Sequence, residues 1–254
     1  MAFTYIFKRI EKKYILTEEQ YRFIRDHIDT RMSVDRYGET VINNIYFDNE
    51  LDELIESSLK KPVYKEKLRL RVYGEADENA TSFFEIKKKY QGVVYKRRIS
   101  LPLKDAYDYI ESGKLPQIEG NIPSEIDYMI KRYRLSPKAY IGYRRIAMVD
   151  NEDPELRITF DTDVTSRYDN IALEEGLIGH RVLPEKTYLM EIKIPGAMPV
   201  WLARMLDELK IYPTSFSKYG KAYLTDKGLD LKFPEVSPEE MTEEIIQKIY
   251  TTGD

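Results

Sequence analysis

The chain has 254 residues, enough for one large domain or two small ones, and one domain of this length buries a substantial core. Its 40 Lys and Arg and 44 Asp and Glu leave a formal net charge of −4, so a polyanion site must come from local clustering rather than from a global positive field. The lack of cysteine excludes disulfides, thiolate zinc sites and cysteine nucleophiles, and two histidines, His27 and His180, are too few for a multi-histidine metal site. With no long apolar run and no signal peptide, a cytoplasmic protein is expected.

Strand and helix patterns follow one another along the chain. Strands are expected at 4–16, 40–48, 64–73, 82–90, 92–101, 138–149, 155–164 and 186–195. Apolar stripes at helical spacing predict helices at 17–28, 50–60, 123–134 and 197–210. Mostly antiparallel strands with interspersed helices indicate an α+β fold.

The C-terminal part has a helix pattern of its own. Ser237 and Glu240 form a capping box, and Pro238 lies in the first turn, so a helix is expected at 237–250. We interpret residues 1–230 as one domain and residues 231–254 as its helical appendage, which packs on the domain, plugs one end of it or binds a partner.

Residues 65–74, KEKLRLRVYG, alternate basic and apolar side chains. Successive residues of a strand point to opposite faces, so Lys65, Lys67, Arg69 and Arg71 share one face and the apolar residues share the other. Lys65 and Lys67 are expected at the mouth of a site or on a solvated surface.

The same alternation occurs on other predicted strands. The further charged or tyrosine residues that share a face with their neighbours are Glu11 and Lys13, Glu85 and Lys87, Lys96 and Arg98, Tyr143 and Arg145, and Glu191 and Lys193, while Arg157 stands alone in its strand. Each strand by itself fits the solvated face of an antiparallel sheet. The predicted helices, however, need an apolar partner, and the apolar strand faces supply one. A barrel with helices outside directs the charged faces inward.

An interior lined by cations is costly unless it is wet or the charges are balanced. Arg and Lys suit phosphate oxygens, and Arg engages two at once. Interleaved glutamates suit a divalent metal, Mg²⁺ or Mn²⁺, that bridges phosphates. The pattern therefore predicts a tunnel for a phosphate chain with a metal at its acidic patch.

The chain carries, in this order, the motifs RIEKKYIL, IYFDN, KLRLRVYG, FFEIKKK, VYKRRISLP, IGYRRIA, LRITFDTD, LMEIKIPG and SFSKYGKAY. This ordered set resembles the VTC domain family, the polyphosphate polymerase branch of the triphosphate tunnel metalloenzymes and a relative of the CYTH proteins. The resemblance implies an eight-stranded antiparallel β tunnel with helices packed outside. It also implies transfer of the γ-phosphate of ATP onto inorganic polyphosphate with release of ADP.

The resemblance assigns roles to individual residues. The candidate catalytic residues are Arg69, Arg71, Lys87, Arg145, Arg157, Lys193 and Lys218. The candidate substrate-binding residues are Lys13, Lys96, Arg98, Tyr143 and Ser217, and the candidate metal ligands are Glu191, Glu11 and Glu85. The resemblance alone selects Ser217 and Lys218. Ser215 stands where some relatives have a basic residue, and the N-terminal motif has one glutamate where CYTH proteins have two, which favours the polymerase branch.

Two other functions remain open, and a third is disfavoured. Hydrolysis of inorganic or nucleoside triphosphate in the same tunnel differs from polymerisation only in the acceptor of the phosphoryl group, which is water instead of a phosphate chain. A sensor that binds polyphosphate or inositol phosphate needs the basic residues but neither Glu191 nor a metal. Single-stranded nucleic-acid binding fits poorly with net acidity and many carboxylates, so no nucleic-acid partner is expected. Members of the family are often part of membrane assemblies, so the resemblance implies a membrane partner protein, although this chain carries no membrane span of its own.

Overall fold

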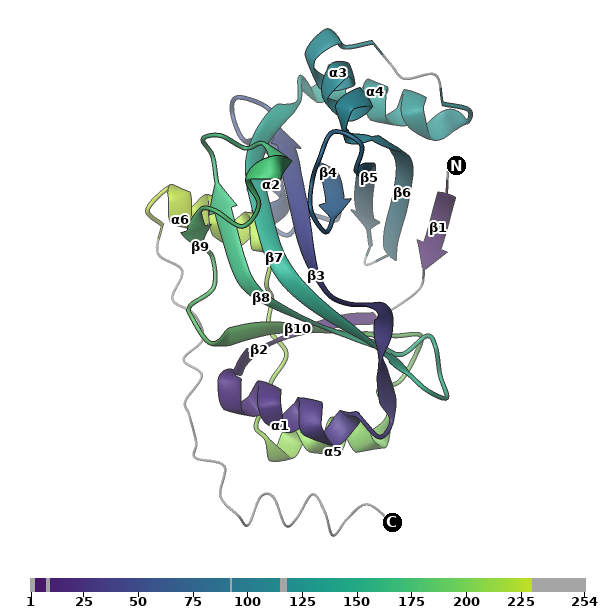
Figure 1. Ribbon diagram of the computed structural model, residues 1–254, viewed down its shortest axis with the longest axis vertical. Coiled ribbons are helices and arrows are strands. Elements are labelled where there is room, and N and C mark those ends of the chain that lie inside the picture. The colour runs from purple at the N-terminus through teal and green to yellow at the C-terminus, as the bar shows by residue number, and fades with distance from the viewer. Residues whose placement is uncertain (1–2, 8–9, 92, 115–117, 230–254) are drawn as a thin grey trace.

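The computed structural model describes residues 3–7, 10–91, 93–114 and 118–229 (Figure 1). Within these residues the strands are β1 Phe3–Phe7, β2 Ile10–Thr17, β3 Met32–Asp48, β4 Tyr64–Tyr73, β5 Thr81–Tyr90, β6 Val93–Pro102, β7 Ser136–Asp150, β8 Arg157–Arg167, β9 His180–Arg181 and β10 Thr187–Ile194. The helices are α1 Glu18–Ile28, α2 Glu53–Leu59, α3 Leu103–Ser112, α4 Asn121–Tyr133, α5 Val200–Glu208 and α6 Lys218–Asp226, with a 3₁₀ turn at Leu173–Glu175.

The strands form one antiparallel sheet in the order β1-β6-β5-β4-β3-β7-β8-β10-β2, and the short strand β9 pairs with the C-terminal end of β8. The two end strands of this order, β1 and β2, are consecutive in the chain. In the described part of the chain no ladder pairs β1 with β2 directly. The long strands β3 and β7 run through both halves of the curved sheet, with β4–β6 on one side and β8, β10 and β2 on the other (Figure 1).

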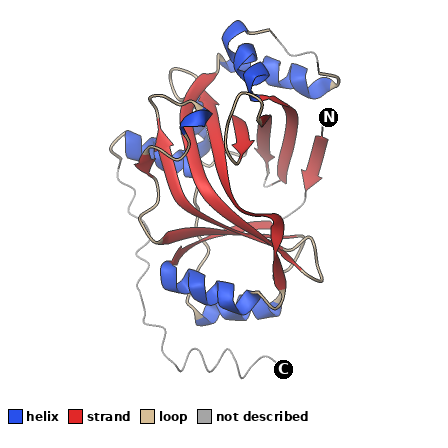
Figure 2. Ribbon diagram, viewed as in Figure 1, coloured by secondary structure: helices blue, strands red, loops and turns tan. Residues whose placement is uncertain are grey.

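Helices cover the apolar outer face of the sheet in two groups (Figure 2). The α3–α4 pair lies over β4–β6, where Phe84 packs at 5.7 Å from the ring of Tyr109 and in one cluster with Ile126. The α1–α5 pair lies over β2, β8 and β10, where Ile24 and Leu202 belong to a second cluster. The apolar residues of the strand alternation are thereby buried, which leaves the charged face on the other side.

Helix α6 lies on the inner face of the sheet. The ring of Tyr219 stacks on that of Tyr46 of β3 with 4.8 Å between centroids. Tyr219 and Tyr223 belong to a third buried cluster with Ile141 and Tyr143 of β7. The N-terminus of α6 therefore comes next to the charged inner face, and Ser217 caps it by accepting a hydrogen bond from the Gly220 amide at 3.1 Å.

The prediction of an antiparallel α+β fold of the tunnel type is confirmed, with differences in detail. The expected strand 4–16 forms two strands that pair at opposite ends of the sheet order. The sequence patterns gave no sign of helices α3 and α6, and α6 packs inside rather than outside. The predicted helix 237–250 and the appendage 231–254 lie outside the described residues.

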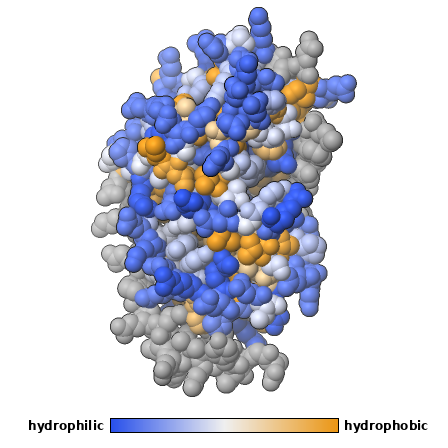
Figure 3. Space-filling view, viewed as in Figure 1, coloured by the Kyte–Doolittle hydropathy of each residue, from blue (hydrophilic) through white to orange (hydrophobic). Residues whose placement is uncertain are grey.

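The face seen in Figure 3 is largely hydrophilic, with smaller hydrophobic areas between the hydrophilic ones. Among the described helices, none has the length and apolar character needed to cross a bilayer.

Candidate functional site

The inner face of the sheet collects the charged residues of the alternation. Strand register sets the neighbours: Arg69 lies opposite Glu85, Lys87 lies opposite Lys67, and Glu191 lies opposite Lys13. Side chains directly opposite each other on one face of antiparallel strands are within contact range. Cations and carboxylates from β2, β4, β5, β6, β7, β8 and β10 therefore meet on one surface.

Glu85 is the centre of a guanidinium cluster. Its side chain is 1% exposed, and its carboxylate contacts Arg69 at 2.6 Å, Lys96 at 2.5 Å, Arg71 at 3.8 Å and Arg98 at 3.9 Å. Burial by itself raises the pKa of Glu85, but the surrounding cations outweigh burial and hold that pKa well below its usual range. Glu85 is therefore ionised, and its negative charge offsets part of the repulsion among the four cations.

Arg71 is oriented by further hydrogen bonds. Its guanidinium donates to Asn44 Oδ1 at 2.8 Å, to the Tyr143 hydroxyl at 3.1 Å and to the Tyr73 hydroxyl at 3.2 Å. The Tyr46 hydroxyl lies next to the same cluster and accepts from Arg69 at 3.1 Å. Burial alone would raise the pKa of Tyr46, but the nearby arginines and Lys67 lower it to about 8.

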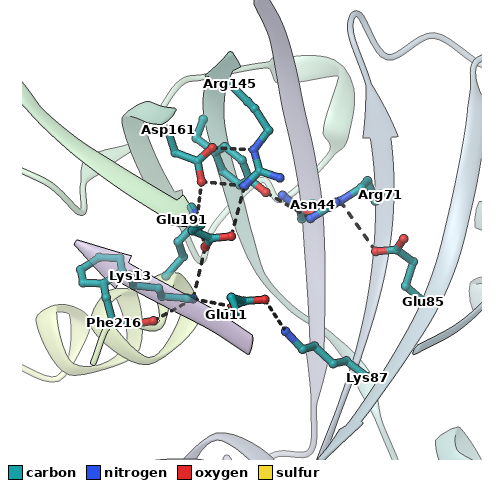
Figure 4. A network of polar contacts seen from close by, with 12 residues as sticks. Glu11, Lys13, Asn44, Arg71, Glu85, Lys87, Arg145, Asp161, Glu191 and Phe216 are labelled. Carbon is teal, nitrogen blue, oxygen red and sulfur yellow. Dashed lines mark hydrogen bonds and ion pairs between the residues drawn. The ribbon is translucent and has the colours of Figure 1, made fainter. Parts of the chain in front are cut away.

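A second cluster surrounds Asp161 and Glu191 (Figure 4). Arg145 donates two hydrogen bonds to Asp161, at 2.5 and 2.7 Å, and Lys218 of α6 contacts the same carboxylate at 2.5 Å. Glu191 contacts Lys13 at 3.2 Å, Lys218 at 3.4 Å and Arg145 at 3.8 Å. Burial opposes ionisation, but these cations lower the pKa of Asp161 and hold that of Glu191 well below its usual range.

Glu11 connects this cluster with β5. Its carboxylate lies 3.6 Å from Lys13 and 3.8 Å from Lys87 (Figure 4). Lys13 also donates to the carbonyl oxygen of Phe216, at 3.0 Å, in the segment that leads into α6. Lys13 therefore holds Glu11, Glu191 and the start of α6 together.

Lysines without carboxylate partners extend the inner face beyond these clusters. Among the described residues, no ion pair joins Lys65, Lys67, Lys89 or Lys193 to an acidic side chain. Lys67 donates instead to the Ser217 hydroxyl at 3.2 Å. Burial and neighbouring lysines lower the pKa of Lys67 to about 8, and burial and Arg145 do the same for Lys193. These lysines therefore make no direct ion pair with a described carboxylate, although Glu191 and Glu11 act favourably on Lys193 at longer range.

Comparison with models of known protein families shows which family the chain belongs to. The sequence model of the VTC domain matches residues 8–225. The chain belongs to the VTC domain family. The match covers every strand from β2 onward and extends into α6.

Solved structures that are similar to this VTC domain have low sequence identity to it. A candidate adenylate cyclase from Bacillus halodurans is similar with a TM-score of 0.50 and 15% identity over 93% of this chain and 98% of that chain. A candidate adenylyl cyclase from Hippeastrum, described as having a dominant triphosphatase activity, has a TM-score of 0.49 and 16% identity over 88% and 97% of the two chains. The PH1819 protein of Pyrococcus horikoshii has a TM-score of 0.45 and 13% identity over 86% and 99%.

The VTC domain brings most of the predicted site residues to one surface. Those in the two clusters or adjoining them are Glu11, Lys13, Arg69, Arg71, Glu85, Lys87, Lys96, Arg98, Tyr143, Arg145, Glu191, Lys193, Ser217 and Lys218. Arg157 differs. It lies opposite Lys193 in the register, but its side chain is exposed and donates to the Pro154 carbonyl at 3.2 Å, so it stands at the edge of the site.

The sequence analysis overlooked Asp161, Asn44 and Tyr46. The alternation contains the signal for Asp161, because residues 157, 159 and 161 share one face of β8. The same reasoning applies to Asn44 and Tyr46, whose apolar neighbours Ile45 and Phe47 face the outer cluster.

The donor set fits a metal bound together with substrate rather than in a protein cage. The part of the chain that the structure describes holds no group of three or more acidic or histidine side chains able to bind a metal ion. Mg²⁺ at phosphate-transfer sites usually takes one or two carboxylates plus phosphate oxygens and water. Glu191 and Glu11, which both contact the Lys13 ammonium, provide such a pair. Glu85 lies in the guanidinium cluster instead, so it fits the role of a charge partner better than that of a metal ligand.

Proposed function

We propose that this VTC domain is a polyphosphate polymerase that transfers the γ-phosphate of ATP to the end of an inorganic polyphosphate chain. The observation that carries this proposal is the row of lysines without carboxylate partners beside the paired clusters. Along β4, Lys65 and Arg71 lie about 20 Å apart at roughly 3.3 Å per residue. This length exceeds what a triphosphate occupies, and it suits a longer polyanion.

The two kinds of cation suit different tasks. Arg69 and Arg71 have fixed partners and planar guanidinium groups, which favour a defined geometry around phosphate oxygens. Lysine is a compact point charge on a flexible stem, so Lys65 and Lys89 can follow a chain that changes position after each addition. We therefore assign the triphosphate to the guanidinium cluster and the acceptor chain to the lysine row.

Transfer needs few groups from the protein beyond positioning and charge neutralisation. A terminal oxygen of the acceptor chain forms a bond to the γ-phosphorus, and the bond from that phosphorus to the β–γ bridging oxygen breaks. ADP leaves with the electron pair of that bond. We assign to Arg145, Lys218 and Lys13 the stabilisation of charge on the transferring group. A divalent metal at Glu191 and Glu11 supplies additional charge neutralisation on phosphate oxygens when it is bound.

The decisive experiment measures products from purified protein with ATP and Mn²⁺. Polyphosphate on a gel, ADP and free phosphate are read together. Lys87→Ala is compared with Lys88→Ala, because the two adjacent residues lie on opposite faces of β5 and Lys88 contacts Glu125 of α4 at 2.8 Å on the outer face. We expect chains from the wild type and from Lys88→Ala, and shorter or fewer chains from Lys87→Ala.

The other products identify the competing functions. Free phosphate without chains means that water is the acceptor and that the protein is a triphosphatase. Tight polyphosphate binding without release of ADP, at any concentration of Mn²⁺ or Mg²⁺, means a sensor. Either result overturns the polymerase proposal while leaving the fold and the phosphate site intact.

A further inference from the structure

The inner face of β4, β5 and β6 changes character along its length. At one end lie the lysines Lys65 and Lys89, which pair in the register. The guanidinium cluster around Glu85 follows. At the other end the same face carries two aromatic residues, Tyr73 of β4 and Phe83 of β5, two residues beyond Arg71 and two before Glu85 respectively. No described role in phosphate binding requires aromatic rings at this position.

The two rings form a compact group with guanidinium planes. Their centroids lie 5.6 Å apart at an interplanar angle of 78°. Arg98 stands over the ring of Phe83 at 4.8 Å, and Arg71 stands over the ring of Tyr73 at 5.4 Å. Tyr73 is 41% exposed, although it belongs to the inner face, so part of its ring is open to a ligand.

These groups suit a planar heteroaromatic ligand. Nucleobases stack on aromatic rings and on arginine guanidinium planes, and such stacking depends little on which base is bound. The adjacent Arg71 and Lys96 belong to the cluster that we assign to the triphosphate. A ligand with a base at one end and phosphates at the other would therefore meet matching groups in the same order.

We propose that Tyr73, Phe83 and Arg98 form the nucleobase site, so that a nucleoside triphosphate is bound with its base at the aromatic end and its terminal phosphate toward the lysines. This inference rests on the proposed function. It makes a nucleotide, rather than inorganic triphosphate, the preferred donor. It also gives the site a direction, with the nucleotide at one end and the acceptor chain at the other.

The test compares the affinities of two probes, ATP and inorganic tripolyphosphate, measured by calorimetry with the full chain and without divalent metal. The quantity measured is the ratio of the two dissociation constants. For Phe83→Leu and for Tyr73→Leu we expect the preference for ATP to fall about tenfold, which corresponds to about 1.4 kcal/mol. Tyr73→Phe keeps the ring and loses the hydroxyl that accepts from Arg71, so it should change the affinity for both probes alike and keep the wild-type ratio.

The possible outcomes separate this inference from the proposed function. If Phe83→Leu and Tyr73→Leu weaken both probes by the same factor, the rings merely orient Arg98 and Arg71, and the nucleobase site is overturned. Equal affinity of the wild type for both probes also overturns it, while the phosphate site stands. If the wild type binds neither probe, the proposed function fails together with the inference. Melting temperatures of all variants report whether each of them is folded.

Discussion

Glu85→Gln is the substitution that tests most directly whether the inner face is built for a polyanion. Glu85 is 1% exposed and contacts four cations at 2.5 to 3.9 Å. Breaking a buried ion pair by removing one partner costs about 3–5 kcal/mol, because the remaining charge has no compensation. Glutamine keeps the shape of the side chain, so we expect the free energy of unfolding to fall by about this amount.

The same substitution should increase affinity for phosphate. The four cations of the cluster lose an internal anion that competes with the ligand. Tripolyphosphate should therefore restore much of the lost stability and should raise the melting temperature of Glu85→Gln more than that of the wild type. Denaturant unfolding with and without tripolyphosphate measures both effects, because a ligand of the folded state adds stability that depends on its dissociation constant.

Glu125→Gln is the matched control. Glu125 also contacts two cations, Arg97 at 2.5 Å and Lys88 at 2.8 Å, but on the outer face of the same strands. The Glu125→Gln substitution should lower the free energy of unfolding by less than Glu85→Gln does. Tripolyphosphate should stabilise this variant no more than the wild type. A Glu85→Gln variant that is destabilised but gains nothing extra from tripolyphosphate would refute the reasoning, because the cluster would then be purely structural.

Three further predictions concern the second cluster and the lysines. Lys67 and Lys193 each have a pKa of about 8, so they are partly neutral at pH 8 and become charged beside phosphate. Polyphosphate binding at pH 8–9 should therefore take up protons and weaken as the pH rises. Calorimetry in buffers of different ionisation enthalpy measures this proton uptake, and a lack of uptake contradicts the assignment. Glu191→Gln should lower metal-dependent ATP turnover by about 100-fold, in line with the loss of one charge-stabilising group; unchanged activation in a Mn²⁺ titration argues against a metal there. Asp161→Asn leaves the buried Lys218 without its closest partner and should cost about 3–5 kcal/mol in chemical denaturation, whereas a wild-type midpoint would show that the pair adds little stability.

The alternation of residues predicted the inner face well because side-chain direction in a strand is a local property. A period of two places Arg69 and Arg71 on one face whatever the partner strands are. Lys88, the residue after Lys87, lies on the opposite face of β5, as the alternation requires, and it contacts Glu125 of α4 on the outer face. Local pattern alone was therefore enough to find most members of the site.

Pairing across the sheet was beyond such reasoning. Glu11, Glu85 and Glu191 look alike in the sequence, each two residues before a lysine. In the fold, Glu85 lies among arginines, whereas Glu11 and Glu191 share Lys13. Register and sheet curvature decide which strands face each other, and neither is encoded within a single strand.

The sequence by itself determined which side chains share a face, which helices have an apolar stripe, and which family the chain resembles, because each depends on local spacing or on an ordered set of motifs. Only the tertiary structure decided that α6 lies inside the curved sheet, that Asp161 holds Arg145 and Lys218 together, and that Arg157 stands at the edge. These features arise from contacts between segments far apart in the chain. Their energies depend on burial and on the distance between charges, which exist only after the sheet has curved and the helices have packed.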